Sequence, residues 1–407
     1  MSVESVLDKA CEGRELSSED GAILFSAEGD DLQRLLRVAD ELRQRGVGER
    51  VGYVINRNVN FTNVCVKRCG FCAFSRGHRA EQGYFLPVEE ILRRVREAWD
   101  LGATEVCMQA GLPPRIDGRF YIDLCAAIKR EIPEIHVHAF SPEEILYGAT
   151  LSDRSLEDYL MAMKDVGLGS LPGTSAEILD DRVREVISPG RISTRDWMAV
   201  IRTAHKLGIP TTSTIMYGHI ETALDRARHL ELLRGIQKES LEKGKTGITE
   251  FVPLSFIAAE APMAKKSQVP GIQSHVSRED VLRMYAVARL MLDAWIPNIQ
   301  ATWVKQGPAL AQECLKAGAN DFGGTLMNES ISTSAGAPHG QFLHPVEMRS
   351  WIRASGRVPV QRSTTYQTLR VFEQEPSQPE ASWDGERFGS YAALIAAPEF
   401  RFRDRRI

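Results

Sequence analysis

The sequence predicts an α/β fold in which eight parallel strands close into a barrel surrounded by helices, a (β/α)8 or TIM-type barrel. Two observations favour it. From about residue 51, short runs rich in β-branched residues alternate with longer runs of helical periodicity, which gives eight strand-then-helix units. Several helical runs end in a glycine stop just before the next strand, as at Gly102 and Gly208. An open doubly wound sheet is the alternative, weakened because no G-x-G-x-x-G follows the first strand.

The expected elements follow in chain order. Residues 1–50 are expected to form a helical cap, since apolar residues recur at helical spacing over 31–42. Strands are expected at Asn58–Asn63, Thr104–Met108, Ile135–Ala139, Leu168–Leu171, Thr211–Met216, Ile248–Pro253, Asn298–Thr302 and Asp321–Thr325. Helices are expected at Val88–Leu101, Ile122–Glu131, Ser155–Val166, Ala176–Ile187, Thr194–Leu207, Ala223–Lys243, Arg278–Trp295 and Gly307–Ala317.

These elements suggest a division of the chain. A helical segment (1–50) precedes a core barrel (51–297) and a segment that completes the barrel and its substrate site (298–370). After about residue 370 the composition shifts to Gln, Pro, Ser and Glu. Residues 371–407 are therefore expected to be a polar surface tail with little fixed structure.

Composition and charge exclude several classes of function. Hydrophobic residues make up 43 % and charged residues 26 %, and 50 basic against 54 acidic residues give a formal net charge of -4. Without a basic excess, binding to nucleic acid or to an anionic membrane is not expected. No apolar run is long enough to span a bilayer, and the N-terminus lacks the apolar core of a signal peptide. We therefore expect a cytoplasmic protein.

Three of the seven cysteines fall within eight residues, as Cys65, Cys69 and Cys72 in a C-x-x-x-C-x-x-C pattern. Three thiolates on one loop can ligate three irons of a [4Fe-4S] cluster and leave the fourth iron open to a small chelating molecule. A structural zinc site is one alternative, with His78 or Cys107 as the fourth ligand. Buried structural cysteines are another, although the Lys and Arg between the thiols argue for a loop.

This motif resembles the signature of the radical S-adenosylmethionine (radical SAM) superfamily. The resemblance implies a barrel with the cluster at its first strand and S-adenosylmethionine chelated to the open iron. Reduction by an external one-electron reductant would then split S-adenosylmethionine into methionine and a 5′-deoxyadenosyl radical.

Longer segments are similar to one subgroup, the CofH-type 4-hydroxybenzyl transferases of deazaflavin (coenzyme factor 420) biosynthesis. They include Ile55–Cys65, Met108–Leu112, His136–Pro142, Gly218–Thr222, Trp303–Lys305, Asp321–Met327 and Gln361–Tyr366. The resemblance implies cleavage of the Cα–Cβ bond of L-tyrosine and transfer of its 4-hydroxybenzyl group to C5 of 5-amino-6-(D-ribitylamino)uracil, with release of 2-iminoacetate. A CofG-type synthase would use the product. The chain departs from the usual pattern at Ala110 and at Gln300–Thr302.

Two alternative functions stay open. One is another radical enzyme of the subgroup, an aminofutalosine synthase or a futalosine cyclase of menaquinone biosynthesis. The other is a non-catalytic iron–sulfur protein that carries electrons. Formation of 5′-deoxyadenosine and of the tyrosine adduct distinguishes all three.

Candidate contacts to S-adenosylmethionine lie beside the cluster motif and after the second and fourth expected strands. They are Phe71, Gln109, Gly111 and Glu177. The segment around Gln109 and Gly111 is expected to hold the amino group, and Glu177 the ribose or the amino group. The alternatives are an ordinary glycine-containing turn and, for Glu177, a carboxylate in the first turn of a helix.

Candidate substrate contacts lie on the expected strands or just after them. His136 and His138 alternate on one strand and so face the same side, with Ser141 nearby. His219 is a candidate base, with Glu221 beside it. The alternatives are hydrogen-bonded core histidines and a merely orienting role.

The remaining candidates belong to the last two expected strands. Trp303 is expected to stack on a substrate ring and Lys305 to attract a carboxylate, with Asn298 at the start of the same strand. Asp321 and Thr325 are expected to meet the ribityl chain. A buried tryptophan with a solvated lysine, and ordinary turn chemistry, are the alternatives.

Overall fold

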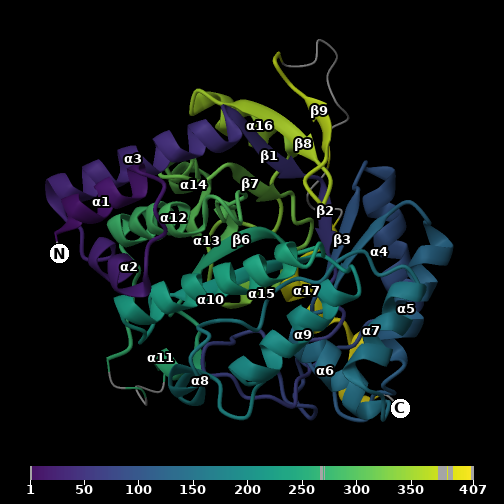
Figure 1. Ribbon diagram of the computed structural model, residues 1–407. Coiled ribbons are helices and arrows are strands. Elements are labelled where there is room, and N and C mark those ends of the chain that lie inside the picture. Colours follow the sequence, from purple (N-terminus) through teal and green to yellow (C-terminus); the bar gives the residue numbers. More distant parts are fainter. Residues whose placement is uncertain (1, 266–268, 270, 375–382, 384–387, 405–407) are drawn as a thin grey trace.

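The computed structural model describes residues 2–265, 269, 271–374, 383 and 388–404 (Figure 1). Its strands are β1 (Arg50–Val54), β2 (Asn56–Asn58), β3 (Glu105–Met108), β4 (His136–Ala139), β5 (Thr211–Tyr217), β6 (Ile248–Ser255), β7 (Asp321–Gly324), β8 (Val358–Arg362) and β9 (Thr368–Val371).

Helices cover the outside of these strands. They are α1 (Val3–Cys11), α2 (Ser18–Leu24), α3 (Gly29–Val47), α4 (Val88–Asp100), α5 (Phe120–Glu131), α6 (Pro142–Leu151), α7 (Leu156–Asp165), α8 (Asp181–Ile187), α9 (Thr194–Lys206), α10 (Ala223–Glu242), α11 (Pro262–Lys265), α12 (Arg278–Leu292), α13 (Trp303–Gln306), α14 (Pro308–Cys314), α15 (Ile331–Ser334), α16 (Pro345–Ala354) and α17 (Tyr391–Ala396). Two 3-10 helices, η2 (Pro398–Phe400) and η3 (Phe402–Asp404), lie near the C-terminus.

The strands form a closed parallel ring of eight positions, which confirms the predicted barrel. The segment β1–β2 pairs with β3, β3 with β4, and β5 with β6. Single bridges complete the circle where no full strand forms, through Ser170 and Leu171 at the fourth position and Ile299 and Gln300 at the seventh. β7 then pairs back with β1. The fourth and seventh predicted strands are therefore present as bridges alone.

The first barrel strand lies earlier than predicted. β1 and β2 together span residues 50–58, whereas a strand was expected over Asn58–Asn63. Residues 59–64 instead form the start of the loop that carries the cysteines, and Thr62 and Val64 make isolated bridges with Phe85 and Arg76. The expected boundary at residue 51 falls within β1.

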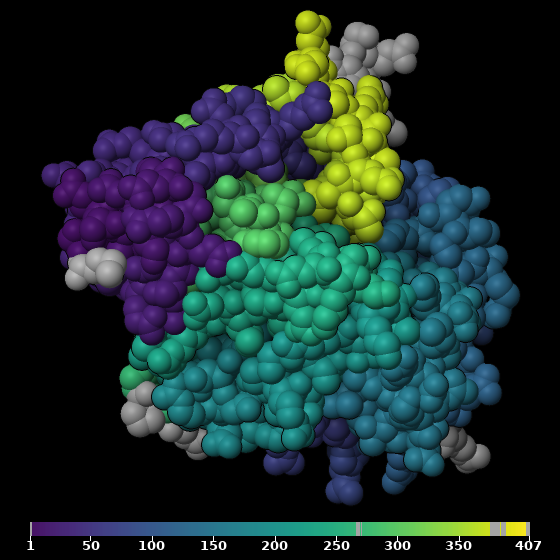
Figure 2. Space-filling view, in the orientation of Figure 1, coloured from purple at the N-terminus to yellow at the C-terminus, as the bar shows by residue number. Residues whose placement is uncertain are grey.

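An additional hairpin, β8–β9, was not expected from the sequence. β8 runs parallel to β1 on the side away from β7, and β9 returns antiparallel to β8. Figure 2 shows this hairpin in yellow beside the indigo helix α3. Arg357 joins the two through an ion pair of 2.8 Å with Asp40. The hairpin brings Arg362 into the barrel, where its guanidinium pairs with Glu250 and Asp321.

The N-terminal helices pack on the outside of the barrel as a cap. α2 lies against α10 and α3 against α12, with buried leucines such as Leu24 and Leu35 between them. Ser2 and Ser17 begin α1 and α2 with capping boxes, which satisfy exposed N–H groups of each first turn.

The prediction of a tail with little fixed structure is wrong for residues 388–404. Tyr391, Leu394 and Phe402 are buried against the rest of the protein. Arg401 forms a bridge with Tyr84, next to the cysteine loop. These apolar side chains attach the segment to the barrel. The prediction rested on the average composition of residues 371–407, which is polar and does not reveal a few apolar residues. Among the described residues, no helix is both long and apolar enough to cross a membrane.

Candidate active site

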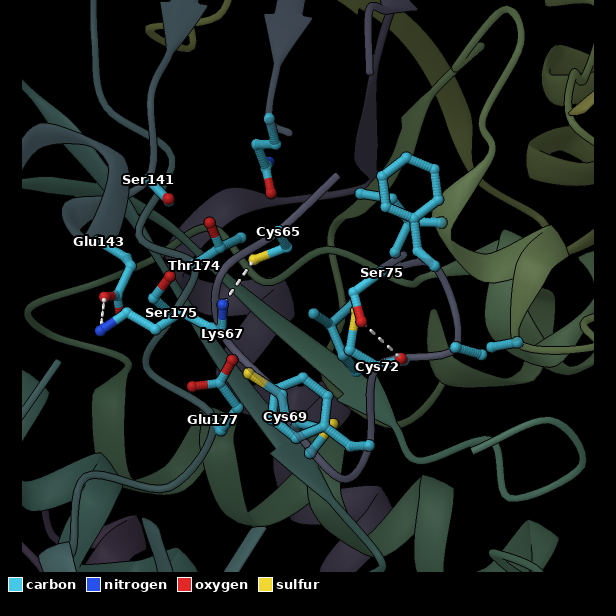
Figure 3. A pocket seen from close by; sticks show the side chains of 18 of the residues that line it. Cys65, Lys67, Cys69, Cys72, Ser75, Ser141, Glu143, Thr174, Ser175 and Glu177 are labelled. Atoms are coloured by element: carbon cyan, nitrogen blue, oxygen red, sulfur yellow. Dashed lines mark hydrogen bonds and ion pairs between the residues drawn. The ribbon is translucent and has the colours of Figure 1, made fainter. Parts of the chain in front are cut away.

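The cysteine loop leaves the barrel after β2, and its three thiols line one pocket (Figure 3). Backbone hydrogen bonds hold the loop at both ends, because the N–H of Cys65 donates to the carbonyl of Arg76 at 3.0 Å and the N–H of Val66 to that of Leu112 at 2.8 Å. The N–H of Gly70 donates to the carbonyl of Ile187 at 2.7 Å. The loop is thus closed on itself at Arg76 and held against two other parts of the barrel, at Leu112 and at Ile187.

The donor set fits an iron–sulfur cluster better than a zinc ion. All seven cysteines are free thiols. Among the described residues, no three His, Cys, Asp or Glu side chains converge on one ion, as the zinc alternative requires. In a cubane each thiolate binds a different iron, so the three sulfurs need to surround a volume rather than a point. Burial raises the pKa of the Cys69 thiol to about 12, so a cationic cluster is the natural partner of its thiolate.

Gly111 lies where two loops touch. Its N–H donates to the carbonyl of Thr62 at 2.9 Å, and a Cβ atom at this position would stand 2.3 Å from the carbonyl oxygen of Val64. Only glycine permits this approach. Gln109, Gly111 and Phe71 line the same pocket as the cysteines, as the sequence predicts.

Glu177 also lines this pocket, and the alternative of helix capping is wrong. Helix α8 begins at Asp181 with Asp180 as its cap, so Glu177 precedes the helix. It has a φ of 38°, a left-handed conformation that side chains rarely adopt. Its carboxylate is paired with Arg191 at 2.9 Å and with Arg184 at 3.4 Å. The backbone therefore holds a carboxylate at the pocket wall at some cost in strain.

Arg191 is the main residue of this pocket that the sequence did not indicate. Its guanidinium lies 3.6 Å from the Sγ of Cys69, donates to the Oγ of Ser175 at 2.6 Å and pairs with Glu177. It also lies over the Phe71 ring, 5.6 Å from the centroid. A lone arginine between α8 and α9 has no recognisable pattern, and the chain fold alone brings it to the thiols.

Ser141 is the cap of α6 and stands at the pocket edge. Its Oγ and N–H both bond to Glu144, which in turn accepts the N–H of Ala110 at 3.0 Å. Burial raises the pKa of Glu144 to about 7. The neighbouring Glu143 pairs with Lys67 at 3.2 Å (Figure 3). Ser141 thus positions the 109–112 loop through Glu144.

A second cavity continues from this pocket into the barrel interior. Six residues line both spaces, and they are Gln109, Thr174, Thr214, Leu254, Lys305 and Ile331. We call the pocket at the cysteines the mouth and the interior cavity the floor. Lys305 stands between them, and its amine has no hydrogen-bond or ion-pair partner among the described residues. Burial lowers its pKa, and the charge of Glu329 opposes that shift.

The floor is polar and contains several ionisable groups. Glu250 accepts hydrogen bonds from Tyr366 at 2.7 Å and Arg362 at 3.2 Å, and Arg362 also pairs with Asp321. Glu105 accepts from Asn56 at 2.8 Å. Burial raises the pKa of Glu250 to about 7. The sequence indicated Asp321, which pairs with Arg362 from outside the floor lining, but not this arginine of β8 that neutralises it.

The two strand histidines differ in position. His138 and His136 lie 2.6 and 2.7 Å from the same Ser170 hydroxyl, so they face one side as predicted. His138 lines the floor. His136 lies at the start of β4 against Gly169 and lines neither the mouth nor the floor. It supports the barrel rather than a ligand.

The predicted base lies outside the cavity. His219 is fully buried, with its Nδ1 accepting the N–H of Ile220 at 2.8 Å and its Nε2 3.0 Å from the carbonyl of Met216. Glu221 accepts from the N–H of His219 at 2.9 Å and from Arg226 at 2.7 Å. Both side chains are hydrogen-bonded within the turn after β5, and neither lines the mouth or the floor, so the structure does not bring the predicted base to the cavity.

Four other predicted contacts are also structural. Trp303 is buried and donates to the carbonyl of Gly324 at 2.9 Å, and Asn298 donates to the carbonyl of Thr249 at 2.9 Å. Thr325 donates to the carbonyl of Asn56 at 2.7 Å. These three, with Asp321, line neither the mouth nor the floor. Each lies on or next to an expected strand, but its side chain is hydrogen-bonded to neighbouring elements of the barrel.

Comparison with known proteins identifies the family. The sequence profile of the radical SAM superfamily matches residues 59–233, and that of the CofH/MqnC C-terminal region matches residues 245–375. A relative from Methanothermobacter thermautotrophicus, named 5-amino-6-(D-ribitylamino)uracil–L-tyrosine 4-hydroxyphenyl transferase, is 46 % identical over 90 % of this chain and 97 % of its own. One from Archaeoglobus fulgidus with the same name is 48 % identical over 82 % and 93 %.

The chain belongs to this transferase family of the radical SAM superfamily. Members of the superfamily use a [4Fe-4S] cluster and S-adenosylmethionine, and the mouth described above has the donor set for both. Membership of this family therefore favours the cluster over zinc and over a merely structural role of the cysteines.

Solved structures support the fold. A methylornithine synthase (PylB) superposes with a TM-score of 0.64 at 19 % identity, over 88 % of this chain and 97 % of its own. The FeFe-hydrogenase maturase HydG from Carboxydothermus hydrogenoformans superposes with a TM-score of 0.68 at 16 % identity, over 89 % and 80 %. At such identities the likeness concerns the barrel alone.

Proposed function

We propose that this protein transfers the 4-hydroxybenzyl group of L-tyrosine to C5 of 5-amino-6-(D-ribitylamino)uracil. In net form, the Cα–Cβ bond of tyrosine breaks, a carbon–carbon bond to the uracil forms, and 2-iminoacetate leaves. S-adenosylmethionine becomes methionine and 5′-deoxyadenosine. The observation that carries the proposal is the 44–48 % identity, over most of their length, to relatives named for this transfer. The thiol-lined mouth and the polar floor adjoin, since six residues line both of them, and so offer two neighbouring subsites.

Cys65, Cys69 and Cys72 would hold the cluster, and Phe71, Gln109, Gly111 and Glu177 would bind S-adenosylmethionine beside it. When bound, the reduced cluster and S-adenosylmethionine supply a 5′-deoxyadenosyl radical. Arg191 keeps the carboxylate of Glu177 and the thiol of Cys69 in place through its charge. The surrounding apolar side chains, including Phe74 and Phe256, exclude water from the mouth.

Lys305 would bind the carboxylate of tyrosine. Its unpaired amine at the boundary of mouth and floor is the cationic group best placed for an amino acid that must meet the mouth. His138 is retained as a floor contact, while His136, His219 and Glu221 are assigned no chemical role.

Three further elements belong to this proposal. A CofG-type synthase would use the product as its substrate, and an external one-electron reductant would prime the cluster. The cytoplasm would be the site of action, because a reducing compartment keeps the thiols free for iron.

Product analysis tests the proposal. Anaerobically reconstituted enzyme is given a reductant, S-adenosylmethionine, ring-labelled tyrosine and the ribityluracil, and the products are identified by mass spectrometry. We expect one labelled adduct and one 5′-deoxyadenosine for each turnover. Turnover of a futalosine-pathway substrate without adduct would favour the alternative enzymes, and absence of 5′-deoxyadenosine would favour an electron carrier.

A further inference from the structure

The floor of the barrel contains buried polar atoms that no protein group satisfies. The Oδ1 atoms of Asn58 and Asn60 and the Oγ1 atoms of Thr174 and Thr364 have almost no exposure to solvent and no hydrogen-bond partner among the described residues. All four residues line the floor. A buried polar atom without a partner is costly, so four of them around one cavity indicate that a polar ligand completes their bonds.

Several strong acceptors lie around this cavity. Besides the two asparagine oxygens, the carboxylates of Glu105, Glu250 and Glu329 line it. Glu105 accepts a hydrogen bond from the Nδ2 of Asn56 at 2.8 Å, and although burial opposes the shift, this bond lowers the pKa of its carboxyl. A cavity lined by acceptors suits a ligand with many O–H and N–H donors.

The guanidinium of Arg362 also lines the floor, but it is not available to bind an anionic ligand. Arg362 is bound by Asp321 and by Glu250 and lies over the ring of Tyr366, 4.0 Å from the centroid. Its charge is therefore neutralised within the protein. A ligand carboxylate placed here would meet Glu105 without an available cation, whereas Lys305, nearer the mouth, has a free amine.

We infer that the floor binds the polyhydroxylated side chain and the ring N–H groups of the uracil substrate, and that tyrosine binds above it at Lys305. The inference rests on the proposed function, which supplies the two substrates. The donor-rich ribityl chain would bond to Asn58, Asn60 and Thr174. The anionic carboxylate of tyrosine would be directed away from Glu105 and Glu250. The uracil would thus have to enter before tyrosine closes the way to the floor.

The test measures binding to reconstituted protein under anaerobic conditions. The variants are Asn58→Ala and Thr174→Val, whose side chains make no hydrogen bond within the protein, so the fold should tolerate them. Thr150→Val, on an exposed surface of α6, is the matched control for Thr174→Val. The ligands are the ribityluracil, 5,6-diaminouracil without its ribityl arm, and L-tyrosine. The spectrum of the cluster reports that each variant is intact.

We expect each floor variant to raise the Kd of the ribityluracil about ten-fold, the effect of one lost hydrogen bond to a buried group. The Kd of 5,6-diaminouracil should rise less, and that of tyrosine should stay within two-fold. Lys305→Met should show the reverse pattern. A floor variant that weakens tyrosine instead, or leaves the ribityluracil Kd within two-fold in both variants, overturns the inference.

The wild-type protein separates this inference from the proposed function. If wild-type enzyme forms the labelled adduct while both floor variants bind the ribityluracil normally, the assignment of the floor is wrong and the function stands. If wild-type enzyme forms no adduct and binds neither substrate, the proposed function itself fails.

Discussion

The two ends of the barrel cavity are built in different ways. The mouth consists of loops, in which thiols, Glu177 and Arg191 are brought together by backbone contacts such as the close approach of Gly111 to Val64. The floor draws many of its side chains from strands, and there Arg362 of β8 pairs with Glu250 and with Asp321, which lies outside the lining. The loops of the mouth thus hold the thiols and charged groups in fixed positions. We infer that the floor, by contrast, recognises its ligand through buried polar atoms that have no hydrogen-bond partner in the protein.

The largest expected difference between the mouth and the floor comes from the three thiols at the mouth. Cys69→Ala removes one of three ligands, so the variant should lose iron, the absorbance of the cluster and all formation of 5′-deoxyadenosine. Cys11→Ala, in the exposed position at the end of α1, is the control and should keep all three. Iron analysis and chromatography of 5′-deoxyadenosine provide the measurement. A fully active Cys69→Ala enzyme would show that the cluster is held elsewhere.

Gly111→Ala tests whether the mouth depends on the contact of two loops. The added methyl group would stand 2.3 Å from the carbonyl oxygen of Val64, so one loop must move, at a cost of about 1–3 kcal/mol in the free energy of unfolding. We expect a loss of S-adenosylmethionine affinity as well. Gly235→Ala, in helix α10 with no atom within 4 Å, should instead stabilise the protein by up to about 1 kcal/mol. Equal effects of the two substitutions, measured by chemical unfolding, would refute the close-contact argument.

Glu177→Gln removes a charge from the mouth and leaves the size of the side chain unchanged. If this carboxylate binds S-adenosylmethionine, the KM of the variant for S-adenosylmethionine should rise about ten- to a hundred-fold, as for a lost charged hydrogen bond. The Kd of the ribityluracil should stay the same. Glu185→Gln, exposed on α8, is the control. A change confined to protein stability, with an unaltered KM, would return Glu177 to a purely structural role.

Glu221 lies outside the cavity, so it provides a contrast with the residues of the mouth and the floor. We expect it to affect the free energy of unfolding and not catalysis. Although burial opposes it, His219 and Arg226 lower the pKa of Glu221 to about 2, against 4.5 in the unfolded chain. The carboxylate thus stabilises the fold above pH 4.5, by about 3 kcal/mol, and this stabilisation is lost as the pH falls towards 2.

The variant Glu221→Gln should therefore weaken the dependence of unfolding free energy on pH below 4.5, whereas Glu242→Gln, exposed at the end of α10, should not. At neutral pH the remaining folded Glu221→Gln enzyme should keep its kcat. A fall of kcat by a hundred-fold or more with unchanged stability would restore this turn as part of the catalytic site.

The sequence predicted the mouth better than the floor, for physical reasons. The thiols lie within eight residues, so their spacing alone defines a ligand loop, and Gln109, Gly111 and Glu177 follow strands at the end where barrel sites form. His219 and Glu221 satisfy the same rule, but backbone N–H groups of their own turn take up their side chains. Position after a strand does not determine which way a side chain faces.

The floor was less accessible to sequence analysis. Asn58 and Glu250 are inward-facing residues of strands, and no local pattern distinguishes them from core residues. Arg362 belongs to β8, a strand that lies outside the eight-unit pattern and was therefore not expected. The barrel itself was predictable because its alternation of strands and helices extends over most of the chain.

An anaerobic crystal structure of the cluster-loaded enzyme would show directly which substrate lies at the floor. The ligands are S-adenosylmethionine, L-tyrosine and 6-(D-ribitylamino)uracil, which lacks the reactive 5-amino group. We expect the ribityl hydroxyls within hydrogen-bond distance of Asn58, Asn60 and Thr174, and the tyrosine carboxylate at Lys305. Tyrosine at the floor with the ribityl chain at the mouth would refute the assignment of the two subsites.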